Sequence, residues 1–139
     1  MDWSELERGA PDLAELARSE FARTGMAPVG TLRQDGSPRI SCVYPHVLDG
    51  ALLLGMMWRS RKAVDLLRDS RLVLRNAICT NRGDEVEVIL RGKAKEISDG
   101  DTRTRYLEAV PAWGTAGSIC SLSISRMPPS SATSRGSST

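Results

Sequence analysis

The sequence is poor in the features that mark several protein classes. Aromatic residues make up 4% of its 139 residues, histidine occurs once, and the three cysteines form no CxxC pair. A core must therefore consist mainly of aliphatic side chains. No second histidine or cysteine is spaced to form a metal site with His46. We therefore expect no metal site. Three cysteines without a CxxC pair are expected to be reduced thiols of a cytoplasmic protein.

Neither sign of charge dominates, and no long apolar run is present. The 19 basic residues are spread along the chain and balanced by 17 acidic ones, which argues against a nucleic-acid partner. The longest apolar stretch, 51–58, is too short to span a membrane. The first residues, Met-Asp-Trp-Ser-Glu, lack the apolar run of a leader peptide. We therefore expect a soluble domain with no membrane partner.

What the sequence does contain is a series of short segments separated by tight turns. Residues 34–38 and 49–50 carry the dense turn signals QDGSP and DG, and the strands between them predict an antiparallel meander. Many short strands with few helices favour a barrel over a doubly wound sheet. The predicted helices are 11–23, 60–67 and 102–110, and the predicted strands are 27–32, 39–45, 51–57, 71–77 and 86–97.

The character of the chain changes at Ser118. Residues 118–139 are rich in serine, proline and small residues, and they show no sustained helix or strand period. We expect one ordered domain over 1–117, followed by an irregular tail over 118–139.

One triplet carries a possible binding chemistry. Ser60 is a good N-cap for the predicted helix 60–67, and the free amide groups of a helix start attract anions. Arg61 adds a planar fork of donors and Lys62 a mobile charge, a combination suited to phosphate oxygens. Arg39 would reach the same ligand if its strand is a neighbour. Taken alone, S-R-K is a weak pattern that also fits ordinary solvated charges.

The order of the segments around this triplet is more specific. The pieces GTL, DGSP, RISCVY, LDGALLLGMM, SRKAVDLL and DSRLVL follow one another over residues 30–74, and RGKAKEI ends the last predicted strand. In this order the chain resembles the pyridoxamine 5'-phosphate oxidase-like family of flavin-binding split β-barrels over about residues 10–110. The resemblance implies a mainly β, α+β fold: a six-stranded antiparallel split β-barrel with short flanking helices.

The resemblance also implies which residues would contact a cofactor. In the family, the edge of the second strand lies along the flavin ring, the end of the third strand contributes nearby, and an S-R-K-type site binds the phosphate. Glu87 stands where the oxidases often place a glutamine. No catalytic side chain is implied. The cofactor contacts so implied are Arg39, Ile40, Ser41, Cys42, Val43, Gly55, Met56, Ser60, Arg61 and Lys62.

The function implied by the resemblance is that of an FMN-binding oxidoreductase acting on an unknown small molecule, as a homodimer with the flavin between subunits. Pyridoxamine-phosphate oxidase activity itself is disfavoured, because nothing after Trp113 resembles the basic C-terminal segment of those enzymes. A reductase that uses the deazaflavin F420 is the main alternative. A non-catalytic flavin- or haem-binding protein is another, with His46 as the haem candidate.

A last alternative concerns the tail. Back-translation of residues 118–139 with GC-rich codons, read two bases later, gives HLFTLDIADAAFIRYLAGEQH as one result. That peptide has strand character and looks like the final strand of the family. We therefore hypothesise that the tail is an out-of-frame reading. The chain would then lack its last authentic strand and be an inactive, truncated product.

Overall fold

The computed structural model describes residues 1–78, 81–110, 117–125 and 132–134. The helices and strands follow the order expected from the sequence, with one further helix at the start and two further strands at the end. The elements are α1 (Trp3–Gly9), α2 (Pro11–Thr24), β1 (Ala27–Leu32), β2 (Pro38–Leu48), β3 (Ala51–Met57), α3 (Arg61–Arg68), β4 (Arg71–Arg75), β5 (Val86–Glu96), α4 (Gly100–Ala109), β6 (Gly117–Ile124) and β7 (Ala132–Ser134).

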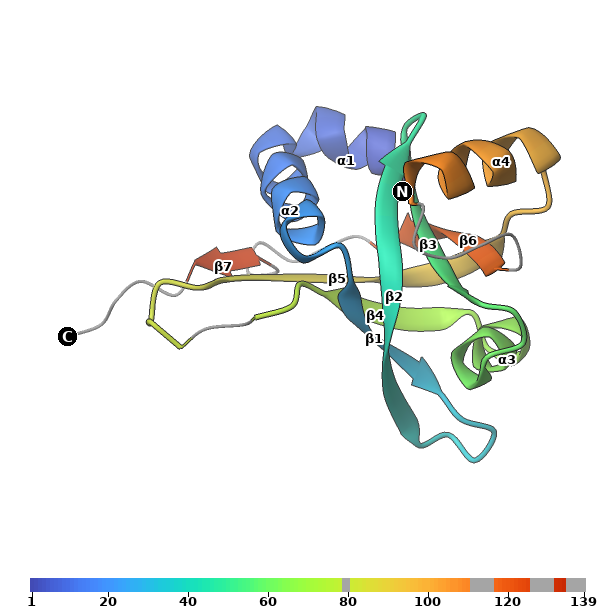
Figure 1. Ribbon diagram of the computed structural model, residues 1–139. Helices are drawn as coiled ribbons and strands as arrows, with labels where there is room; N and C mark the ends of the chain where they lie inside the picture. Colours follow the sequence, from blue (N-terminus) through green and yellow to red (C-terminus); the bar gives the residue numbers. More distant parts are fainter. Residues whose placement is uncertain (79–80, 111–116, 126–131, 135–139) are drawn as a thin grey trace.

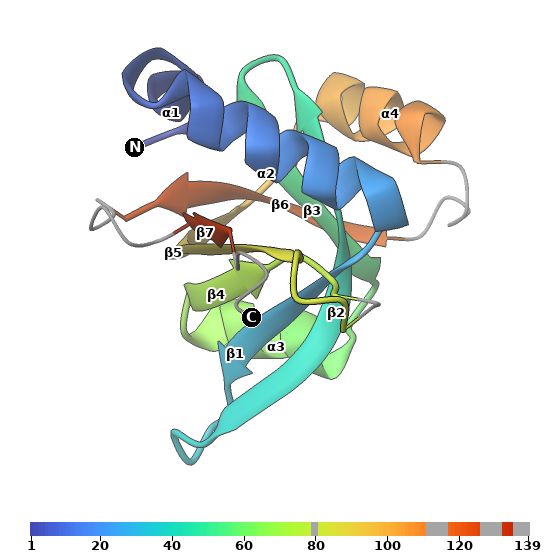
Figure 2. The ribbon, with the colours of Figure 1, turned by 90° about the vertical axis from the view of Figure 1, so that its left-hand side faces the viewer.

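Six of the strands form a closed antiparallel barrel (Figures 1 and 2). The sheet order is β4-β1-β2-β3-β6-β5, and pairing between β4 and β5 closes it. β5 is long enough to pair with β4 and with β6, and Gly92 lies opposite both strands. A Cβ atom at Gly92 would come within 2.0 Å of the Ser123 carbonyl oxygen. The predicted split-barrel fold is thus confirmed, and the glycine inside the long strand allows close backbone approach.

The prediction of an irregular segment from Ser118 onward is wrong for residues 118–124. These residues belong to β6, which pairs with β3 on one side and β5 on the other. The buried residues Ile119, Cys120, Leu122 and Ile124 are interrupted by the serines at 121 and 123, so the local sequence shows only a weak apolar alternation. Two neighbouring strands supply the backbone partners that the local sequence cannot specify. The barrel therefore has its sixth strand, and a three-residue strand, β7, pairs with the start of β5.

The four helices cover the barrel at different places. α1 and α2 pack over one side and bury Trp3, Leu6 and Phe21 in the main core. Leu53 and Ile119 form a second cluster with Tyr106 of α4. α3 connects β3 to β4 and lies close to the lower part of the β1–β2 hairpin (Figure 1).

Candidate functional site

The predicted anion site lies at the start of α3. Ser60 caps the helix, and its hydroxyl accepts a hydrogen bond of 3.3 Å from the Ala63 amide. Arg61 is exposed and Lys62 half-buried. Within the described residues, neither side chain makes a hydrogen bond or an ion pair, and the first turn contains no acid. The helix start therefore presents two uncompensated cations beside its own free amide groups.

The turn that enters α3 adds a third cation. Arg59 adopts a left-handed backbone with φ of +54°, which is uncommon for a residue other than glycine. Its guanidinium lies 5.6 Å from the centre of the Trp58 ring, at a distance typical of a cation–π contact. The amide of Ser60 donates to the Met57 carbonyl at 3.1 Å and closes the turn. The sequence did not single out Arg59, because its position depends on this turn.

The second part of the site is an open edge of β2. Residues 38–43 pair with β1, whereas pairing with β3 begins only at Tyr44, opposite Gly55. β3 instead continues along β6 up to Met57 and then turns into α3. Among the described residues, no strand pairs with the second edge of 38–43. The outward-facing backbone groups of this edge therefore have no strand partner in the described part of the chain.

The side chains of this edge point to different environments. Ile40 is 81% exposed, Cys42 is partly buried, and the side chain of Val43 lies in the barrel core. Val43 can therefore contact a ligand through its backbone but not through its side chain. The hydroxyl oxygen of Ser41 is buried and has no hydrogen-bond partner among the residues that the structure describes, which is unusual for a buried polar atom. Contact of Ser41 with a cofactor remains a prediction.

Arg39 is tied to α3 by a buried carboxylate. Its Nε donates to Asp65 at 2.7 Å, and Thr31 donates to the same oxygen at 2.8 Å. Burial of the Asp65 carboxyl acts to raise its pKa, but hydrogen bonds from Arg39, Thr31 and Arg68 outweigh burial and hold the pKa below its usual value. The carboxylate thus stays charged and brings the strand edge and the helix together. The sequence analysis missed Asp65, although its spacing of four from Arg61 places both residues on one helix face.

Gly55 and Met56, at the end of β3, pack in two different places. A Cβ atom on Gly55 would lie 2.0 Å from the Tyr106 hydroxyl, which donates to the Tyr44 carbonyl at 2.7 Å. Gly55 therefore makes room for Tyr106. Met56 is buried and lines a cavity next to α3. Their contact with a cofactor remains a prediction.

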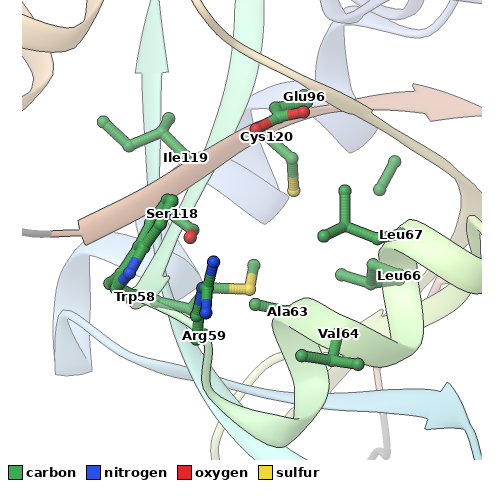
Figure 3. A pocket seen from close by; sticks show the side chains of 12 residues that line it. Trp58, Arg59, Ala63, Val64, Leu66, Leu67, Glu96, Ser118, Ile119 and Cys120 are labelled. Atoms are coloured by element: carbon green, nitrogen blue, oxygen red, sulfur yellow. The ribbon is translucent and has the colours of Figure 1, made fainter.

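This cavity has a volume of about 200 Å³ and opens between α3, β5 and β6 (Figure 3). Its wall is mainly apolar, with Ala63, Leu66 and Leu67 contributed by α3. Figure 3 shows the Cys120 thiol directed into it, and Trp58 and Arg59 at the side that leads to the start of α3. Burial raises the pKa of Cys120 to about 12, so the thiol is an apolar wall group and not a nucleophile. The cavity offers apolar surface beside the start of α3, where the anion site is predicted.

Two other residues from the sequence analysis lie away from α3. Glu87 forms an ion pair of 3.2 Å with Arg75. His46 lines a second cavity, of about 310 Å³, together with Arg18 and Phe21 of α2. Burial, with a smaller contribution from Arg18, lowers the pKa of His46, so its imidazole is neutral at pH 7. Within the described ranges, no three His, Cys, Asp or Glu residues group as metal ligands, and no helix is long and apolar enough to cross a membrane.

Comparisons with known proteins support the architecture. No family model and no curated protein matches the chain. Among solved structures, the chain is similar to a protein from Listeria innocua that carries the provisional name pyridoxamine 5'-phosphate oxidase, at 10% identity and a TM-score of 0.62 over 78% of this chain and 90% of the other. It is also similar to a NimC/NimA family protein from Clostridium acetobutylicum, at 14% identity and a TM-score of 0.64 over 78% and 81%.

A third match is HutZ, the haem storage protein of Vibrio cholerae, at 9% identity and a TM-score of 0.64 over 85% and 91% of the two chains. Identities this low establish shape and not activity. With the observed strand order, they show that the chain has the split β-barrel fold of the pyridoxamine 5'-phosphate oxidase-like proteins.

Proposed function

We propose that this protein binds a flavin mononucleotide through its phosphate and serves as an oxidoreductase for a small molecule. One observation carries the proposal. Arg61 and Lys62 have no partner among the described residues, and they stand at the capped start of a helix that the Arg39–Asp65 bond ties to the open-edged part of β2. The arrangement offers charge-assisted donors for a phosphate and backbone groups for a planar heterocycle within one region of the surface.

Each part of the site has a separate task in this proposal. Ser60, Arg61 and Lys62 bind the phosphate, and residues 39–43 offer the backbone edge that hydrogen-bonds the ring. The buried Ser41 hydroxyl, which has no partner among the described residues, would need a small side-chain rotation to reach a ligand at that edge. The cavity beside α3 offers apolar surface to a non-polar part of the ligand. A bound flavin supplies the hydride or electron chemistry, so no protein side chain need be a nucleophile or a general base.

A homodimer is part of the proposal. Large apolar side chains are exposed on β2 (Ile40), at the end of β3 (Met57), on the turn that follows it (Trp58) and on α3 (Leu67). Exposed apolar groups gathered around a site are typical of a surface that another protein covers. A second copy packed on this region would enclose the cofactor site between subunits, as the resemblance implies. Sedimentation of the purified protein checks the oligomeric state.

Two other cofactors compete with FMN. The deazaflavin F420 offers a similar phosphate and ring, so the same residues would bind it. Haem is favoured by a different observation: HutZ, a haem storage protein, shares the fold, and His46 is a neutral, half-buried imidazole beside a cavity. A haem ligand at His46 would lie apart from the Ser60–Lys62 site and would not need it.

The absorption spectrum of the purified protein separates these cofactors. Flavin bands that disappear in the Arg61→Ala, Lys62→Ala variant are expected for FMN. A colourless protein that binds added F420 supports the deazaflavin, and a Soret band lost in His46→Ala supports haem. The proposal is wrong if the double variant and the wild type bind FMN equally.

The out-of-frame hypothesis for 118–139 needs a separate test. β6 shows that 117–124 form a strand as written, but it does not decide the coding frame. Sequencing the source DNA around Gly117 settles this point. An intact frame without an alternative strand-coding register would end the hypothesis of an inactive, truncated product.

A further inference from the structure

One buried carboxylate joins the two parts of the candidate site. Asp65 is 3% exposed and accepts hydrogen bonds from Thr31, Arg39 and Arg68, at 2.8, 2.7 and 3.2 Å. Thr31 and Arg39 face each other across the β1–β2 ladder. Asp65 therefore links α3 to the hairpin whose free edge forms the other part of the site.

The link fixes one end of a flexible side chain. The Nε atom of Arg39 is bonded to Asp65, while both Nη groups have no hydrogen-bond partner among the described residues. Asp65 follows Arg61 by four residues, so the two positions lie on one face of α3. One turn corresponds to about 5.4 Å along the helix axis. Arg39 is thereby held beside Asp65, about one helical turn from Arg61.

From this geometry we infer that Asp65 is a positioning residue of the anion site: it holds Arg39 so that the free Nη groups join Arg61 and Lys62 in binding a phosphate. The inference rests on the proposed function, which it deepens by assigning a task to a residue that touches no ligand. Asp65 acts through Arg39, whereas its bond to Arg68 anchors α3 near the carbonyl of Leu32, to which Arg68 also donates.

The affinity for phosphate should change in opposite directions on neutralisation of Asp65, depending on whether Asp65 positions Arg39 or acts only through its charge. Removing a negative charge near an anion site should tighten phosphate binding if charge alone matters. If Asp65 positions Arg39, the Asp65→Asn variant loses a charge-assisted bond and frees the guanidinium, so phosphate binding should weaken. Asp69→Asn is the matched control, because it makes the same charge change at the exposed end of α3, where Asp69 pairs with Arg71.

The first test measures FMN and riboflavin affinity by fluorescence quenching in both variants, with thermal unfolding as a check of folding. We expect Asp65→Asn to weaken FMN binding about tenfold, the loss of roughly one charge-assisted hydrogen bond. Riboflavin, which has no phosphate, should bind both variants like the wild type. FMN affinity in Asp65→Asn that equals or exceeds that of Asp69→Asn would overturn the inference.

A double-mutant cycle identifies the residue through which Asp65 acts. In an Arg39→Gln background, Asp65→Asn should cause no further loss of FMN affinity. An equal loss in both backgrounds overturns the link through Arg39. If Asp65→Asn does not fold, Thr31→Val replaces it, since this change removes one donor to Asp65 and keeps the shape of the side chain. About a threefold loss of affinity is then expected, corresponding to one neutral hydrogen bond, and no loss would contradict the inference.

A probe other than FMN separates this inference from the proposed function. Inorganic pyrophosphate is titrated while NMR follows the Arg39 Nε–H signal and the amides of Arg61 and Lys62. A wild type that binds pyrophosphate but not FMN refutes the flavin proposal, and weaker pyrophosphate binding by Asp65→Asn still supports the positioning role. A wild type in which pyrophosphate shifts none of these signals refutes both.

Discussion

The two ends of α3 differ in whether their basic side chains are paired with acidic ones. At the C-terminal end, Arg68 pairs with Asp65 and Arg71 pairs with Asp69. At the N-terminal end, Arg61 and Lys62 have no acidic partner in the described part of the chain, and the first turn contains no acid. A helix dipole favours acids at the N-terminus, so the cations there work against helix stability. Such a local conflict is expected where charge serves a ligand and not the fold.

The largest expected effect on FMN binding comes from removing the two unpaired cations at the start of α3. Arg61→Ala combined with Lys62→Ala should weaken FMN binding at least about 100-fold, because two charge-assisted bonds are lost. The protein should become slightly more stable, since two cations are removed from the positive end of the helix dipole. Fluorescence titration measures the affinity, and urea unfolding measures the stability.

The control for this prediction lies at the paired end. Arg71→Ala removes one cation of an exposed ion pair and should leave FMN affinity within about twofold of the wild type. Equal losses in the Arg71→Ala variant and the double variant would mean that general positive charge attracts the ligand. The comparison between the two helix ends would then fail.

A smaller effect is expected from changing the cap while keeping the helix. Asp is as good an N-cap as Ser, and its charge suits the helix dipole, so Ser60→Asp should stabilise the protein by about 0.5 kcal/mol. The same carboxylate would repel a phosphate and weaken FMN binding about tenfold. Thermal unfolding and titration of one variant thus test whether stability and binding oppose each other. A Ser60→Asp variant that is more stable and also binds FMN more tightly would contradict the opposition between stability and binding at this helix end.

The smallest effect concerns acid sensitivity of the paired end. Hydrogen bonds from the Arg71 side chain and amide lower the pKa of Asp69 from 3.8 to about 2. A carboxyl with a lowered folded pKa stabilises the protein above its unfolded pKa, and this stabilisation is lost as the pH falls through the folded value. The urea concentration at the unfolding midpoint should therefore decrease as the pH is lowered from 3.8 to about 2. It should decrease less in the Asp69→Asn variant. The same slope in both proteins would argue against the Asp69–Arg71 pair.

Much of the fold followed from local signals, with particular exceptions. The helix at 60–67 was predicted from a capping serine and an apolar stripe, and the structure places it at Arg61–Arg68. The helix at 11–23 was predicted from its apolar face, and it ends at Gly25, whose φ is +73°. α1 was missed, although Asp2 caps it through the Glu5 amide, because seven residues show too little periodicity. β6 was missed because its serines hide the buried positions.

The candidate site divides in the same way. By itself, the sequence determined that Ser60, Arg61 and Lys62 stand at a helix start, because capping and helical periodicity depend on residues within one or two turns. Only the tertiary structure decided that residues 38–43 have an open edge and that Arg39 meets Asp65, 26 positions along the chain. These features depend on strand register and on where a helix docks. Both are fixed by burial and pairing between distant segments, which no local pattern encodes.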